Sequence, residues 1–107
     1  MTTEELEILT KQGEGYTLEF KENIGKKFAV EVVAFANSMG GIILIGIDDD
    51  GNIIGTDTSN NQRANIQNQI SQIEPRINVK IEVVDNVIVV NVPEGDDKPY
   101  SSSEANY

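Results

Sequence analysis

The chain has 107 residues and contains neither cysteine nor histidine, which excludes disulfides, thiolate chemistry and the usual histidine general base. Its 18 acidic and 8 basic residues give a net charge of −10, which disfavours nonspecific binding to a phosphate backbone, because that binding rests on lysine and arginine displacing counterions. The length suits one domain with a single core. No apolar run approaches the roughly 18 residues that predict a membrane span, so we expect a cytoplasmic domain without membrane contact.

The first elements are predicted to be a helix followed by a strand. Threonine followed by acidic residues predicts a helix start at residues 2–3, and Gly13 predicts its end. Segment 15–21 then alternates between apolar and polar residues, which is typical of a half-buried strand. In this pattern Tyr16 and Phe20 are predicted to face the core.

A second helix and a central strand are predicted next. Apolar residues recur at helical spacing over 26–37, and Gly40 and Gly41 end this helix. The run over 42–47 shows no alternation, which predicts an inner strand that is covered on both faces. Gly46 interrupts this run and predicts either a bulge or the close passage of another backbone segment.

The second half of the chain predicts two hairpins with a helix between them. Turn residues at 48–52 lead into a return strand that begins at Ile53. A helix is predicted over 60–73, although its asparagine and glutamine content gives it weak propensity. Strands over 78–84 and 87–92 then form the second hairpin. The order α-β-α-β-β-α-β-β predicts an α+β fold in which one mixed sheet packs against helices.

Short segments in a fixed order resemble the Schlafen AlbA-like domain, a family once described as a divergent AAA-type domain. The matching residues are Glu14 with Glu19-Phe20-Lys21, the AFANSMGG segment at 34–41, the LIGIDDDG segment at 44–51, and Lys98-Pro99-Tyr100. The resemblance covers nearly the whole chain and implies a domain over 1–100, followed by a polar tail over 101–107 in a chain cut from a longer protein. It also implies a nucleic-acid-associated, DNA-binding role in microbial transcriptional regulators. Whether the isolated domain is an enzyme stays open, and we expect that it is not.

Three carboxylates form the first candidate site. Related domains in vertebrate Schlafens gather carboxylates near a metal in a ribonuclease core, and the resemblance carries that role to Glu14, Glu19 and Asp48. Three oxygen ligands suit Mg²⁺ or Mn²⁺, the only cofactors we expect. Lys21, two residues beyond Glu19, would stabilise charge on a phosphate. The alternative interpretation is a solvated strand face for Glu19 and Lys21 and a capped turn at Asp48.

Glycines and lysines form two further candidates. The Gly40-Gly41 pair ends a helix, whereas phosphate loops place glycines at a helix start, so we interpret the segment as a C-cap in which Asn37 bonds locally. The candidate nucleic-acid contacts, with solvated side chains as the alternative, are Lys21, Lys26, Lys27 and Arg63.

Three functions therefore remain open. The first is a regulatory domain that contacts nucleic acid within a longer protein. The second is a metal-dependent nuclease. The third is a homo-oligomerisation module, in which the strongly β-forming segment 87–92 pairs with a second copy at a sheet edge.

Overall fold

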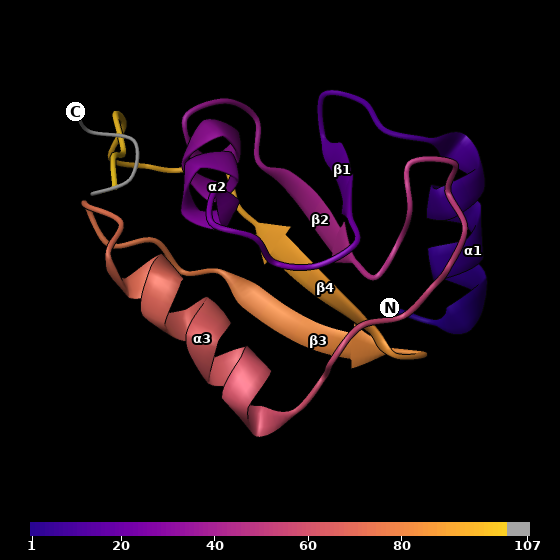
Figure 1. The fold of residues 1–107 in the computed structure, drawn as a ribbon. Coiled ribbons are helices and arrows are strands. Elements are labelled where there is room, and N and C mark those ends of the chain that lie inside the picture. Colours follow the sequence, from indigo (N-terminus) through magenta and orange to yellow (C-terminus); the bar gives the residue numbers. More distant parts are fainter. Residues whose placement is uncertain (103–107) are drawn as a thin grey trace.

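The computed structural model describes residues 1–102 and contains, within them, three helices and a four-stranded sheet (Figure 1). The elements are α1 (Thr3–Gln12), β1 (Leu18–Lys21), α2 (Phe28–Ala36), β2 (Gly41–Ile45), α3 (Asn60–Ser71), β3 (Lys80–Val84) and β4 (Val87–Val92). The strand order is β1-β2-β4-β3, in which β1 and β2 are parallel and the other two pairs are antiparallel. This mixed sheet confirms the predicted α+β class and element order, with the return strand of the first hairpin reduced to a bridge between Ile47 and Ile53.

Helices cover both faces of the sheet, as Figure 1 shows for α2 and α3 on one side and α1 on the other. Successive side chains of β2 therefore enter different layers. Ile43 and Ile45 lie in the apolar cluster beneath α2 and α3. Leu44 lies in a second cluster beneath α1. All three side chains are fully buried, which confirms that the unbroken apolar run predicts a strand covered on both faces.

Helix α1 is capped at both ends as the sequence predicts. The backbone amide of Glu5 donates to Thr2 Oγ1 at 3.1 Å, and the amide of Thr2 donates to the Glu5 carboxylate at 2.9 Å, which completes a capping box. Gly13 ends the helix with φ 85°. Leu6 is fully buried and holds the helix against the second face of the sheet.

The prediction that Tyr16 faces the core is wrong. Strand β1 begins only at Leu18, and the Tyr16 side chain is 94% exposed. Gly15 and Leu18 exchange backbone hydrogen bonds of 3.0 and 3.4 Å across a tight turn. Tyr16 lies within this turn, so the alternation of the strand does not extend to it.

Gly46 lies where another segment of backbone passes, which confirms one of the two readings of this glycine. Its φ is 113°, and a Cβ at this position would lie 3.0 Å from the carbonyl carbon of Gly55. Gly46 also accepts hydrogen bonds from the amides of Ile54 and Gly55, at 2.8 and 2.9 Å. These contacts hold the segment after the turn beside β2, although it does not continue as a strand.

The second hairpin has the predicted two-residue turn. Asp85 and Asn86 both have positive φ, at 49° and 63°, as a type I′ turn requires. Strand β4 lies between β2 and β3, so the prediction that segment 87–92 pairs with a second copy at a sheet edge is wrong. Both sides of β4 are already paired, one with β2 and the other with β3.

The end of the described chain is anchored to the segment after α3. The backbones of Ser101 and Glu74 exchange two hydrogen bonds of 2.8 Å. The rest of the predicted polar tail, from residue 103 on, lies outside the described residues. Of the helices in residues 1–102, none combines the length and apolar character needed to cross a membrane.

Candidate functional site

The structure brings Glu14 and Glu19 together beside the edge strand β1. Glu14 lies in the turn before the strand, and its Oε2 accepts a hydrogen bond of 2.9 Å from the backbone amide of Phe20. The Glu14 carboxyl also hydrogen-bonds the half-buried carboxyl of Glu19. Burial, and then the hydrogen bond and charge of Glu14, raise the pKa of Glu19 to about 7. Glu19 therefore keeps its proton up to about neutral pH, beside the Glu14 carboxyl.

Lys21 belongs to the same strand face but is occupied by an ion pair. Its Nζ lies 2.7 Å from Glu31 Oε1 on α2, and the Lys21 side chain is only 16% exposed. Glu31 adds to the negative charge that raises the pKa of Glu19, whereas Lys21 opposes it. Lys21 therefore links β1 to α2, and its charge is largely neutralised before any phosphate approaches.

Asp48 uses its carboxylate to form a turn. Oδ1 accepts from the backbone amides of Asp50 and Asn52, at 2.9 and 2.8 Å, and Oδ2 accepts from the Asn52 side-chain amide at 3.1 Å. The hydrogen bonds from Asn52, with smaller contributions from Asp50 and Gly51, lower the pKa of Asp48. This is the capped turn of the alternative interpretation.

The predicted three-carboxylate site is therefore not assembled. Glu14 and Glu19 meet, but across residues 1–102 there is no group of three acidic, histidine or cysteine side chains placed to hold a metal ion. Asp48 already accepts three hydrogen bonds, and one carboxylate oxygen of Glu14 accepts a hydrogen bond from a backbone amide. These residues do not fit a three-ligand magnesium or manganese site as they stand, so we derive no chemistry through a metal.

Asn37 joins two distant parts of the chain. It follows α2 as its C-cap, as predicted, but the prediction that its side chain bonds locally is wrong. Its Oδ1 accepts from the backbone amide of Tyr100 at 2.6 Å, and its Nδ2 donates to the Tyr100 carbonyl at 3.0 Å. Gly40 lies nearby with φ 77°, and a Cβ there would lie 2.6 Å from the backbone nitrogen of Glu94. The glycine-containing segment is thus a structural junction.

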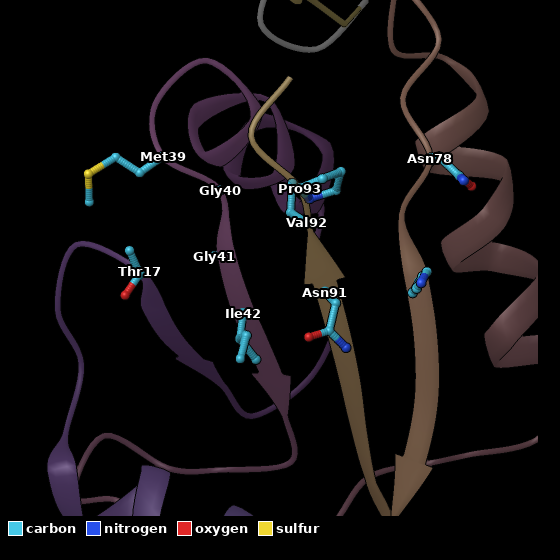
Figure 2. A pocket seen from close by; sticks show the side chains of 10 residues that line it. Thr17, Met39, Gly40, Gly41, Ile42, Asn78, Asn91, Val92 and Pro93 are labelled. Carbon is cyan, nitrogen blue, oxygen red and sulfur yellow. The ribbon is translucent and has the colours of Figure 1, made fainter. Parts of the chain in front are cut away.

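A groove of about 450 Å³ opens at the end of the sheet where β2 begins and β4 ends (Figure 2). Ile42, Asn91 and Lys80 are paired in register across three strands and line it. Thr17 and Met39 flank it, as Figure 2 shows. The lining contains no carboxylate, and Lys80 is its one charged residue. A protein of net charge −10 therefore presents a locally non-acidic groove.

Three of the predicted basic contacts are available at the surface. Lys26, Lys27 and Arg63 are exposed, near the starts of α2 and α3. Lys80, which lines the groove, was not among the basic residues selected from the sequence. Its place on the polar side of a predicted strand was readable, but its register with Asn91 and Ile42 was not.

The fold and these sites define a small, open-sheet α+β domain with a groove free of carboxylates and with two carboxyl side chains paired beside an edge strand. The chain matches the family described as Schlafen, AlbA_2 over residues 14–107 and belongs to that family. This confirms the resemblance drawn from the sequence.

Two solved structures are similar to the chain. The N-terminal domain of an ATP-dependent DNA helicase RecG-related protein from Nitrosomonas europaea is 25% identical, with a TM-score of 0.67; the match covers 96% of this chain and 81% of that one. The DIP2311 protein from Corynebacterium diphtheriae is 23% identical, with a TM-score of 0.58, and the match covers 84% of this chain and 20% of that one. The chain thus spans about a fifth of that protein's length. No curated protein matches the chain.

Proposed function

We propose that the domain is a cytoplasmic, nucleic-acid-associated module of a larger regulator. Family membership and the likeness to the N-terminal domain of a helicase-related protein support this role. The observation that carries the proposal is the groove over β2, β4 and β3, because it lacks carboxylates on a strongly acidic protein. The absence of carboxylates from the lining lowers the local repulsion of phosphate.

The groove residues offer contacts to an unpaired base, so we propose a single strand as the ligand. Lys80 would contact a phosphate, and the side-chain amides of Asn78 and Asn91 would donate to or accept from an unpaired base. Tyr16 is 94% exposed and precedes the groove residue Thr17, which makes it a candidate stacking residue. One lysine implies weak, salt-sensitive binding, which further domains of the longer protein would reinforce.

Binding of labelled single-stranded DNA and RNA, followed by fluorescence anisotropy at about 50 mM salt, tests this proposal. We expect Lys80→Gln to weaken binding severalfold and to lower the slope of log affinity against log salt by about 0.7, the loss of one phosphate contact. Lys11→Gln removes the same charge from an exposed position on α1 and is the matched control. Absence of binding, or equal effects of the two substitutions, would contradict the proposal.

Exposed lysines elsewhere provide a comparison surface. The double variant Lys26→Gln/Lys27→Gln removes two charges from the segment that leads into α2. If this variant loses binding while Lys80→Gln does not, the domain contacts nucleic acid through the start of α2 instead of through the groove.

A metal-dependent nuclease is the second candidate, and the Glu14–Glu19 pair is the one observation that favours it. Glu14 and Glu19 would supply two of the carboxylate ligands that such a site needs, and within residues 1–102 no third acidic side chain is placed beside them. Calorimetric titration of Mn²⁺ and Mg²⁺ into the protein and into Glu14→Gln/Glu19→Gln tests this candidate. Saturable binding that the variant loses supports it, and identical titrations refute it. Asp48→Asn tests separately whether the turn carboxylate takes part.

A further inference from the structure

The two outer strands of the sheet differ in how their free edges are covered. Strand β1 is blocked by its own chain: the backbone of Leu18 exchanges hydrogen bonds with Gly15, and the amide of Phe20 donates to Glu14. These contacts occupy the groups through which another strand would add. Glu14 thus has a structural role, because its hydrogen bond to Phe20 blocks the addition of another strand at the free edge of β1.

Strand β3 has no such cover within residues 1–102. The type I′ turn at Asp85-Asn86 makes Val84 and Val87 a hydrogen-bonded pair. Pairing alternates from there, so the backbone groups of Ile81 and Val83 point away from β4. Neither residue makes another backbone hydrogen bond in the described part of the chain. Val83 is also 39% exposed, although its neighbours on the same face are packed.

We propose that β3 pairs with β3 of a second copy of this chain, antiparallel and centred on Ile81, to form a continuous eight-stranded sheet. The segment Val79-Lys80-Ile81-Glu82-Val83 is self-complementary about its middle residue. An antiparallel two-fold arrangement places Ile81 opposite Ile81 and pairs each remaining residue with its mirror position.

Both faces of this arrangement are complementary. On the face of the sheet that α2 and α3 cover, Val79 of one copy lies opposite Val83 of the other, which covers the exposed Val83. On the opposite face, Lys80 lies opposite Glu82 in both directions, at the close spacing of a non-hydrogen-bonded pair. The Glu82 side chain is 41% exposed and already binds the Met1 amine at 2.5 Å through Oε1, which leaves Oε2 for the lysine.

Charge also selects the register. Centring the pair on Glu82 would place two glutamates directly opposite each other, which is destabilising. The net charge of −10 makes two copies repel each other at long range, so association is best measured at physiological salt, where screening acts beyond about 8 Å. Since Lys80 also lines the groove, a nucleic acid bound there would compete with pairing.

Charge reversal in a mixing experiment tests the proposal, with mass measured by sedimentation in the absence of nucleic acid. Lys80→Glu places only acidic residues at these positions, and Glu82→Lys places only basic ones. We expect the wild-type chain to dimerise, each variant alone to be monomeric, and an equimolar mixture of the two to form a dimer. The double variant Lys80→Glu/Glu82→Lys exchanges the two charges and should dimerise like the wild type.

Matched substitutions away from the edge complete the experiment. Lys11→Glu and Glu22→Lys make the same charge changes at exposed positions on α1 and after β1, and should leave the dimer intact. Circular dichroism of each variant verifies that it is folded. A wild-type chain that is monomeric at high concentration, or variants that dimerise alone as well as when mixed, would overturn the proposal. Neither result bears on whether the groove binds nucleic acid.

Discussion

Replacing Glu19 by glutamine is predicted to make the protein more stable at pH 8 but not at pH 5. Burial and Glu14 raise the pKa of Glu19 from an ordinary 4.5 to about 7. Between these values the unfolded chain releases the proton and the folded chain keeps it. The folded state then binds more protons, so the free energy of unfolding falls as pH rises from about 4.5 to 7. Glutamine mimics the protonated carboxyl, since its amide can donate to Glu14.

The size of the effect follows from the same values. At about 1.36 kcal/mol for each pH unit, the full difference between 4.5 and about 7 corresponds to about 3.4 kcal/mol. Glu19 is only half-buried, and solvent screens its charged neighbours, so we expect about 1 to 2 kcal/mol. The variant should exceed the wild type by this amount at pH 8 and equal it near pH 5.

Urea denaturation of both proteins at several pH values from 5 to 8 measures this difference. Glu22→Gln removes the same charge from an exposed position three residues away, and is the control for net charge. The reasoning is refuted if Glu19→Gln and Glu22→Gln follow the same pH profile, or if Glu19→Gln is less stable than the wild type at pH 8. Added Mn²⁺ that stabilises only the wild type would favour the metal-binding candidate instead.

Three further predictions concern the junction and the turn. Asn37→Ala should cost about 1 to 3 kcal/mol in urea denaturation, because it leaves the backbone amide and carbonyl of Tyr100 without their partners. Gly40→Ala should destabilise the protein by about 2 kcal/mol more than Gly13→Ala. Both glycines have positive φ, but only at Gly40 would a Cβ lie against backbone, at 2.6 Å. Equal losses of stability in the two variants would contradict the structure. Asp48→Ala should lower the urea midpoint more than Asp48→Asn, because asparagine keeps an acceptor for the turn amides. Since the pKa of Asp48 is lowered in the folded protein, the stability difference between the wild type and Asp48→Ala should shrink as pH drops below about 4.

The elements that were predicted well are those with a strong period and a clear end. The buried run of β2 and the two-residue turn before β4 follow from local sequence, as does α1 with its capping box. Tyr16 was misplaced because alternation of residue types does not show where pairing begins. The bridge between Gly15 and Leu18 closes a turn that the pattern of side chains cannot reveal.

The order of the strands in the sheet was the larger feature that the sequence analysis did not predict. Strand β4 adjoins β3 in the chain, and the unbroken apolar run over 87–90 was not used to place β4 as the inner strand of the pair. The near-continuous burial of Val87–Val92, against the partial exposure of Lys80–Val84, reflects this choice. The groove and the free edge both depend on the sheet order, so neither was predicted as a site, although Ile42, Lys80 and Asn91 were assigned to strands.

The motifs that identify the family are mainly those that hold the fold together. Asn37 of the AFANSMGG segment binds Tyr100 of Lys98-Pro99-Tyr100, and Lys98 Nζ donates to the Ser38 carbonyl at 3.0 Å. Glu14 and Asp48, which the resemblance marked as metal ligands, protect a strand edge and close a turn. Each motif thus has a sufficient structural cause. Family membership therefore specifies this architecture more strongly than any chemistry, and the residues that distinguish this chain's function are better sought at Lys80, Glu82 and the groove.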